Sequence, residues 1–512
     1  MKRPSLPQLL ALLLPLAAFF VHAQTSSGLP LPTAPPSNAT TVAQNNSEVI
    51  AYLLLEPATA LPKLNALAVN PHALPFTRLV LSFIRPDMVY IPSSFTLERT
   101  GLEVVNASSA SWAGVNNASN FNDYGFAELK KLVTILQAGG IEVFLSVGGW
   151  NFNCFAYLYM KYSIAYFVVG PNAWKLNGDP SSCTPNNQFC YVCEPPTEGT
   201  TLADFAIFPE PTDSPTWQAA QAYISSNPLA PRAEWHPEIV GGSVYNATKT
   251  NYTVIVPGTA MWKMLQRDPY QDVVYLAKDL GVSGIDLDYE EIWHADTFRT
   301  ADSPQGPFHL DQTVLKYTAI ARDLMINIQS LYPTCKLSVA AAAAGAWQGP
   351  WWGGNLKGLW YWSQLWYPAV TEFMTVGTNA GGVNAMTYDL SQDDTFHECP
   401  SATMPCDLAS QVAFYLAQFR ALPLLQNARV GFETGTPAYP DATHDAHGQL
   451  PLTTAALAQI AAQVDLSAGA ILWELYKRAG PGEANATAVL QAVCAKALGV
   501  ANARCVGVVP AY

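Results

Sequence analysis

Three acidic residues, Asp286, Asp288 and Glu290, stand at alternate positions in a short apolar segment of this chain. The segment follows an amphipathic stretch, residues 261–280, that ends like a helix, so we expect an extended strand here. Side chains on a strand alternate between its faces, which places the three carboxyl groups on one face, about 6 to 7 Å apart. Repulsion at this spacing predicts a raised pKa for one of them, as a general acid for bond cleavage requires.

The same acids could also form a solvated strand edge or a calcium-binding loop. Ile285 and Leu287 on the opposite face indicate a buried strand instead, and burial of acids without Lys or Arg beside them is costly. Glu290 lies nearest the C-terminal end of the strand, whereas Glu291 points to the other face. We therefore expect Glu290 to be the proton donor.

Eight short apolar runs alternate with helix-period segments and must position these acids. The alternation is typical of a parallel sheet wrapped by helices, and eight strands favour an α/β fold, the closed (β/α)8 TIM barrel. A doubly wound open sheet is the alternative, but no glycine-rich phosphate loop follows the first run. Helices are expected at 126–138 and 312–331. The expected strands are 49–55, 78–83, 141–146, 284–290, 336–342, 383–388, 429–432 and 469–473.

A large insertion after strand three interrupts this rhythm. Residues 151–260, 110 in number, form an interval far longer than an ordinary loop between a strand and a helix. Because the interval leaves the third strand at its C-terminal end, it should stand on the catalytic face of the barrel. It would serve there as a lid or a cleft wall, or as surface decoration, since long loops cost little entropy.

Length and charge limit the organisation and the partners of the chain. Its 512 residues suffice for one large domain with insertions or for two ordinary domains. The formal net charge of −13 disfavours an acidic polymer such as nucleic acid as a partner. We place the barrel domain at 48–505, followed by a short tail at 506–512.

The N-terminal residues have the pattern of a secretory signal. Lys2 and Arg3 precede an apolar run, 9–21, and Ala23 offers a cleavage site, so we predict a signal peptide at 1–23. An uncleaved signal anchor is the alternative. Residues 24–47 are rich in Pro, Ser, Thr and Asn and should form a disordered, glycosylated linker. No later run is long and apolar enough to span a bilayer, so the protein is expected to be secreted and extracellular.

Sequons and cysteines agree with an oxidising compartment. Nine cysteines leave at least one thiol free or intermolecular, and neighbours in sequence suggest the pairs Cys399–Cys406 and Cys494–Cys505. A second cysteine set could instead hold zinc, namely Cys154, Cys183, Cys190 and Cys193. Seven Asn-x-Ser/Thr sequons begin at Asn38, Asn45, Asn106, Asn117, Asn246, Asn251 and Asn485.

Four motifs in the same order resemble those of glycoside hydrolase family 18, the chitinases and endo-β-N-acetylglucosaminidases. Residues 284–290 resemble the end of the family's DGxDxDxE signature on strand four, and 145–149 resemble its SxGG on strand three. Residues 386–389 resemble its MxYD on strand six, and Trp473 its tryptophan at the end of strand eight. The resemblance covers most of 49–498 outside the insertion.

The resemblance implies a role for each matching residue. Glu290 would protonate the glycosidic oxygen, and Asp288 would hold the acetamido N–H of the sugar and balance the developing positive charge. Tyr388 would donate to the acetamido oxygen, which attacks its own anomeric carbon in a retaining, substrate-assisted reaction. Asp286 would be the inner partner of Asp288. Asp389 would bind sugar hydroxyl groups and tune the acid.

Further residues are expected to contact the sugar. Trp473 would form the apolar floor under the reacting ring. Trp150 and Trp347 follow strands three and five and could stack on sugars, with packing between helices as the alternative. The other expected substrate-binding residues are Met386, Ser146, Gly148 and Gly149.

Two departures from the family pattern affect the details. Ser283 replaces the leading acid of the signature, and we expect it near the base of the strand, where it would affect proton sharing deep in the barrel. The 36 residues between Phe432 and Gly469 leave no room for the small α+β domain that some members carry after strand seven. Without that domain the cleft is expected to be shallower, unless the insertion supplies a wall.

Three functions fit these observations. The leading hypothesis is a monomeric, secreted hydrolase of β-1,4-linked N-acetylglucosamine that acts on chitin or chito-oligosaccharides without metal or cofactor. An endo-β-N-acetylglucosaminidase acting on N-glycan or peptidoglycan is the second. A non-catalytic chitin-binding lectin on the same barrel is the third, although such relatives usually lack the acid found here at Glu290.

Overall fold

Eight parallel strands form the centre of the molecule in this computed structural model. Hydrogen-bonded neighbours follow the order β6-β5-β4-β3-β2-β1-β8-β7, and all pairs are parallel. The strands are β1 Glu48–Leu54, β2 Arg78–Ile84, β3 Glu142–Gly148, β4 Gly284–Asp288, β5 Lys336–Ala342, β6 Ala380–Met386, β7 Val430–Glu433 and β8 Gly469–Trp473.

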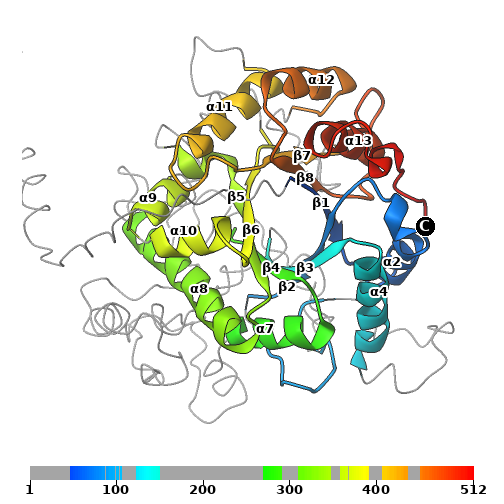
Figure 1. The fold of residues 1–512 in the computed structure, drawn as a ribbon, viewed down its shortest axis with the longest axis vertical. Helices are drawn as coiled ribbons and strands as arrows, with labels where there is room; N and C mark the ends of the chain where they lie inside the picture. The colour runs from blue at the N-terminus through cyan, green and yellow to red at the C-terminus, as the bar shows by residue number, and fades with distance from the viewer. Residues whose placement is uncertain are drawn as a thin grey trace, which may run out of the picture. The chain divides into compact units, whose positions relative to one another are not determined.

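Arg429 closes this sheet into a barrel. Its backbone N–H donates to the Val383 carbonyl oxygen, and its own carbonyl accepts from the Ala385 N–H, both at 2.9 Å. These bonds join β6 to the start of β7, so the two ends of the strand order meet. The predicted (β/α)8 TIM barrel is confirmed, and its strands form a ring inside the helices (Figure 1).

The structure describes residues 47–149, 269–290, 310–347, 358–390, 406–435 and 450–512, without 87, 99, 103, 106–122 and 367. All of them fall in one unit, Gln44–Tyr512. The predicted signal peptide, nearly all of the predicted linker and the 151–260 insertion lie outside the described residues.

The described helices cover the outside of the barrel (Figure 1). Three of them begin at side chains that accept a backbone N–H two or three residues into the helix, Asp407 from Ser410, Thr453 from Ala456 and Asn485 from Ala488. The helices are α2 Ala60–Ala68, α4 Phe126–Ala138, α7 Pro269–Leu280, α8 Leu310–Leu331, α9 Leu359–Trp366, α10 Pro368–Thr375, α11 Leu408–Arg420, α12 Thr454–Gln463 and α13 Ala486–Ala497, with short 3-10 turns η1 Pro71–Ala73, η7 Ala343–Ala346 and η10 Ala503–Val506.

Alternation along the strands separates two apolar regions. Outward residues such as Ile285 and Leu287 join the large core between the sheet and the helices. Inward residues form a smaller cluster inside the barrel, composed of Ile50, Tyr52, Val80, Phe144 and Ile471 with Met386, Tyr388 and Trp473 around it. The inner cluster therefore holds three residues that the sequence assigned to the site.

Buried charges fill the end of the barrel where the strands begin. Arg78 is 1% exposed, donates to Glu142 at 2.7 Å and to the Gly381 carbonyl at 2.7 Å, and lies 4.0 Å from the centre of the Phe144 ring. Arg429 donates to the same carbonyl at 3.0 Å. Burial, followed by the adjacent Arg78, lowers the pKa of Arg429 to about 10, so it remains charged at neutral pH.

The C-terminal segment is fastened to this same end. The predicted disulfide Cys494–Cys505 is present and joins α13 to η10. It holds Arg504, which donates to backbone carbonyls before β2 and after α4, among them those of Pro71 at 3.0 Å and Gly139 at 2.7 Å. The chain then continues along α13, where the Val509 N–H donates to the Thr487 hydroxyl group at 3.1 Å.

The remaining described cysteines are of two kinds. Cys406 is disulfide-bonded, and its predicted partner Cys399 lies outside the described residues, as do the four cysteines considered for zinc. Cys335 is a free thiol that is fully buried beside the first residue of β5, and burial raises its pKa to about 12. None of the helices in the described ranges combines the length and apolar character needed to cross a membrane.

Candidate active site

The acids of β4 point into the barrel as the alternation predicts. Asp286 is fully buried and Asp288 is 4% exposed, whereas Ile285 and Leu287 face the helices. The strand ends at Asp288, two residues before its predicted end. Glu290 therefore lies just beyond the strand, at the C-terminal mouth of the barrel, and is partly exposed.

Asp286 is held by three hydroxyl groups from three different strands. Its carboxyl group accepts hydrogen bonds from Tyr52 at 2.9 Å, Ser146 at 3.0 Å and Ser338 at 2.6 Å. Ser146 and Ser338 are its direct register neighbours on β3 and β5. Burial raises the pKa of Asp286, and these three hydrogen bonds and the charge of Arg78 oppose that rise. Asp286 is thus fixed in one orientation.

Asp288 interacts with the proposed acid. Its side chain is hydrogen-bonded to that of Glu290, and its backbone carbonyl accepts from the Gly149 N–H at 2.9 Å. Burial raises the pKa of Asp288 well above its usual range, and repulsion by Glu290 and then Asp286 adds to the rise. Two carboxyl groups in hydrogen-bond contact must share a proton. The sequence predicted a raised pKa for one of the acids, and Asp288 has it. The pKa of Asp286 is also raised.

Tyr388 lies two residues beyond the end of β6, close to the same carboxyl groups. Burial raises the pKa of its phenol well above the usual value, and repulsion by Asp288, Glu290, Glu433 and Asp389 follows in that order. The phenol consequently keeps its proton over the whole physiological range. It can act there as a hydrogen-bond donor but not as a base.

Trp473 ends β8 beside two other aromatic rings. It stacks on Phe83 at 5.4 Å between ring centres, and it meets Tyr52 edge-on at 6.0 Å. Phe83 also explains one of the glycines, because a Cβ atom at Gly149 would lie 2.3 Å from the Phe83 ring. Gly149 therefore allows close packing of backbone on a ring, and it has a left-handed φ of +70°.

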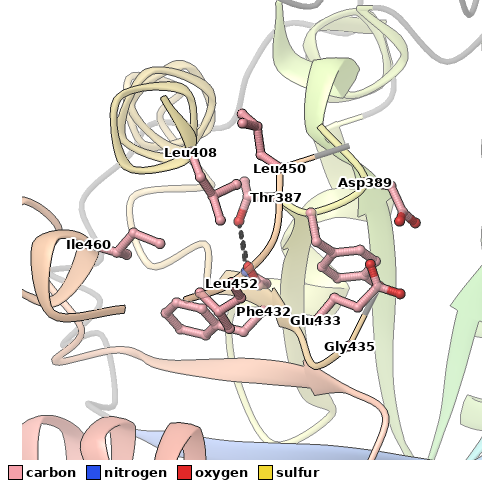
Figure 2. Close-up of a pocket in the computed structure, with 11 residues that line it drawn as sticks. Thr387, Asp389, Leu408, Phe432, Glu433, Gly435, Leu450, Leu452 and Ile460 are labelled. Carbon is pink, nitrogen blue, oxygen red and sulfur yellow. Dashed lines mark hydrogen bonds between the residues drawn. The ribbon is translucent and has the colours of Figure 1, made fainter. Parts of the chain in front are cut away.

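A second group of polar residues lies beside Tyr388. Asp389 is exposed, and Glu433 at the end of β7 is 6% exposed, forms an ion pair with Lys477 and is hydrogen-bonded to Asp389. Figure 2 shows both carboxyl groups on one side of a small pocket, whose other wall is formed by apolar residues such as Leu408 and Ile460. Burial, followed by repulsion from Asp389, raises the pKa of Glu433, and Lys477 opposes that rise.

Some expected residues lie elsewhere. Ser283 points away from the interior, because its hydroxyl group donates to the Gln137 side chain on α4 at 3.2 Å. The expectation that Ser283 affects proton sharing deep in the barrel is therefore wrong. Trp347 packs edge-on against Phe414 and Tyr415 of α11, each at 5.6 Å.

Other expected residues are close to the acids or cannot be placed. Met386 borders the inner apolar cluster, and Ser146 binds Asp286 directly. Gly148, at the end of β3, pairs in register with Asp288 and has a φ of +103°. Trp150 lies outside the described residues. Within the described ranges, no group of three or more His, Cys, Asp or Glu side chains is arranged to hold a metal ion.

Sequence reasoning missed four residues of the site: Tyr52, Ser338, Phe83 and Glu433. Ser338 had a readable signal, because it is a polar residue at an inward position of an otherwise apolar strand. Tyr52 alternates with Ile50 on the inward face of β1 in the same way. Phe83 and Glu433 gave no such signal, since their neighbours in space come from distant parts of the chain.

No protein-family model and no curated protein matches the chain. Among solved structures, a GH18 chitinase from Pseudoalteromonas aurantia is similar at 13% identity and a TM-score of 0.35, with 84% of this chain and 94% of that chain covered. A chitinase from Rhizomucor miehei is similar at 12% identity and a TM-score of 0.35, with 87% and 98% covered.

A third similar structure is the xylanase and α-amylase inhibitor protein XAIP-II from Scadoxus multiflorus. Its identity is 11% and its TM-score 0.32, with 88% of this chain and 98% of that chain covered. The name of the Pseudoalteromonas aurantia structure contains the glycoside hydrolase family that the four sequence motifs resemble. The barrel expected from that resemblance is the barrel observed.

Proposed function

We propose that this protein is a secreted glycoside hydrolase that cleaves β-1,4-linked N-acetylglucosamine, with chitin or chito-oligosaccharides as its substrate. The single observation that supports this proposal best is the contact between Asp288 and Glu290 beside the Tyr388 phenol. At the mouth of the barrel this contact brings together the protonated Asp288, the Glu290 carboxyl group that exchanges the proton with it, and the neutral Tyr388 phenol as a hydrogen-bond donor.

In the first step Glu290 gives a proton to the glycosidic oxygen as the bond to the anomeric carbon breaks. The oxygen of the sugar's own acetamido group forms the new bond to that carbon, so no protein carboxylate has to attack it. Asp288 accepts a hydrogen bond from the acetamido N–H and balances the positive charge that develops. Tyr388 donates to the acetamido oxygen and orients it for attack.

In the second step water attacks the anomeric carbon, the bond from that carbon to the acetamido oxygen breaks, and the water passes a proton to Glu290, which restores the acid. Two inversions at the same carbon retain the configuration of the product. Asp286, fixed by its three hydroxyl donors, keeps its position while Asp288 exchanges a proton with Glu290. Trp473 offers an aromatic face to the C–H bonds of the reacting ring.

The experiment is release of a reporter group from a chitotriose glycoside by the full-length protein between pH 3 and 8. Glu290→Gln should lower kcat by about two to four orders of magnitude, because general acid assistance is lost. The same variant should keep its affinity for chitotriose, since the sugar contacts remain. Wild-type protein that binds chitotriose but releases no reporter would show a lectin, and cleavage of a denatured high-mannose glycoprotein instead would show an N-glycan endoglycosidase.

A further inference from the structure

The ends of β6, β7 and β8 bring together three charged side chains. Glu433 ends β7 with its carboxyl group buried, and Lys477, four residues beyond the end of β8, forms an ion pair with it. The Lys477 side chain is itself only 12% exposed. Glu433 also makes a side-chain hydrogen bond to Asp389, which follows β6.

Asp389 is the exposed member of the three. Its backbone has a left-handed φ of 54°, a conformation that Asp tolerates better than most residues. An exposed side chain of this kind would rotate if it had no partner, but the hydrogen bond to Glu433 holds the Asp389 carboxyl group in place. Because Glu433 is itself held by Lys477, the orientation of Asp389 is set by two buried residues from the neighbouring strands.

We propose that Glu433, fixed by Lys477, is a positioning residue that orients the Asp389 carboxyl group toward a hydroxyl group of the bound sugar. The inference rests on the proposed function, because Asp389 is expected to bind the sugar only if the mouth of the barrel is a sugar site. It adds a requirement on β7 and β8 that the sequence motifs do not contain.

A purely structural role for the pair fits the surroundings less well. Apolar side chains of similar size would seal the neighbouring pocket at no electrostatic cost, and such a replacement of a buried ion pair is often neutral or stabilising. The pair also lies within reach of the Tyr388 phenol, which is repelled by Glu433 as well as by the acids of β4. The two acidic groups thus flank one reacting centre.

Protonation should control this positioning. The groups that face Glu433 among the described residues are Asp389 from the end of β6, Lys477 from the segment after β8, and the Tyr388 phenol. When Glu433 loses its proton as the pH rises, the two carboxylates repel one another. Asp389 then turns away, and KM for the oligosaccharide rises with pH.

The test compares three variants of the full-length protein. Glu433→Leu combined with Lys477→Met removes both charges, so no unpaired charge is left buried. This double variant should raise KM, and the Kd of chitotriose measured in a Glu290→Gln background, about tenfold, as expected for one lost hydrogen bond. Its kcat should stay within about threefold of wild type, because the lost contact is equal in ground and transition states.

Glu433→Gln is the conservative rescue. Its amide can accept from Lys477 and donate to the Asp389 carboxylate, so KM should return to the wild-type value and should no longer rise with pH. Glu128→Gln, at an exposed ion pair on α4, is the matched control and should behave as wild type. In an Asp389→Asn background the double variant should change neither KM nor Kd, because Glu433 acts only through Asp389.

The outcomes separate this inference from the proposed function. A double variant with wild-type KM and Kd would overturn the inference, as would an unchanged effect of the double variant in the Asp389→Asn background. A Glu433→Gln protein no better than the double variant would do the same. Loss of reporter release in the wild type would overturn only the hydrolase proposal, since the Kd comparison still measures whether Glu433 positions Asp389.

Discussion

At the scale of single residues, the site depends on where one proton is held among three carboxyl groups. Asp286 has three hydroxyl donors and the Arg78 charge to favour its ionised form, whereas the pKa of Asp288 is raised by burial and by both acidic neighbours. The different surroundings therefore act differently on the pKa values of two chemically identical carboxyl groups. Asp286 is held in one orientation by its three donors, and Asp288 shares a proton with Glu290.

Ser338 makes this separation testable. Ser338→Ala removes the shortest of the hydrogen bonds to Asp286, at 2.6 Å, so the Asp286 carboxylate becomes less stable and binds a proton at higher pH. The acid limb of the kcat/KM profile should move to higher pH, and kcat/KM on that limb should fall about three- to tenfold.

The measurement is a pH–rate profile with the chitotriose reporter. Ser363→Ala removes another buried hydroxyl group, which donates to the Leu359 carbonyl within α9, and it should leave the profile unchanged. An acid limb in Ser338→Ala that coincides with the wild-type limb would show that Ser338 has no influence on the acids.

At the scale of elements, the segment after β8 connects Trp473 to β1 through Glu474. This carboxyl group is 8% exposed and accepts from the Tyr476 N–H at 3.1 Å and the Leu54 N–H at 3.5 Å. Burial raises its pKa to about 7, against the opposing charge of Lys63. Trp473 is thus followed directly in the chain by an acid that ionises near neutral pH.

Glu474 should make stability depend on pH. Below about pH 4.5 the group is protonated in folded and unfolded chains, and between 4.5 and about 7 only the folded chain keeps the proton. The free energy of unfolding therefore falls as pH rises through this window. Glu474→Gln lacks the effect, so its stability relative to wild type should improve between pH 4.5 and 8 by about 3 kcal/mol.

Urea unfolding at several pH values would measure this difference. Glu128→Gln, which replaces a partly exposed carboxyl group, is the control and should show no such trend. A difference between Glu474→Gln and wild type that stays constant from pH 4.5 to 8 would contradict the prediction.

Strand patterns made most of the elements predictable. Strands 336–342 and 469–473 and helix 126–138 have their predicted bounds, because each is a clear apolar run or helical stripe between turn residues. The sixth strand was placed three residues late, because its start, Ala380–Gly382, has no large apolar side chain. The acids and Tyr388 followed from motifs. Glu433 and Lys477 could not be predicted, because only closure of the barrel brings β7 and β8 beside β6.

At the scale of the whole molecule, closure depends on the buried arginines at the base of the barrel. Arg429 donates to carbonyls of Gly381 and Ala468 and to the Asn384 side chain, at 3.0 to 3.3 Å. Its backbone is the bridge between β6 and β7. One residue thus connects the last parts of the ring to one another.

Arg429→Met should weaken the whole barrel. The Gly381 and Ala468 carbonyls keep other donors, Arg78 and the Glu48 N–H, whereas the Asn384 side-chain oxygen loses the donor that Arg429 gives it. Loss of these three hydrogen bonds should cost about 2 to 4 kcal/mol of unfolding free energy. Arg420→Met, which removes a half-buried arginine that donates to a single carbonyl, that of Ala428, should cost about 1 kcal/mol. Thermal unfolding checks both, and an Arg429→Met protein no less stable than Arg420→Met would contradict the assignment.

The buried free thiol beside the start of β5 has a practical consequence. Cys335 is shielded from solvent by the packed sheet and helices, so an alkylating reagent can reach it only when that wall separates. The rate at which Cys335 is modified, followed by mass spectrometry of the peptide that carries it, measures how often the packed sheet and helices around it open spontaneously. Bound oligosaccharide should lower this rate in proportion to the occupancy of the site, which gives a binding assay that does not require turnover.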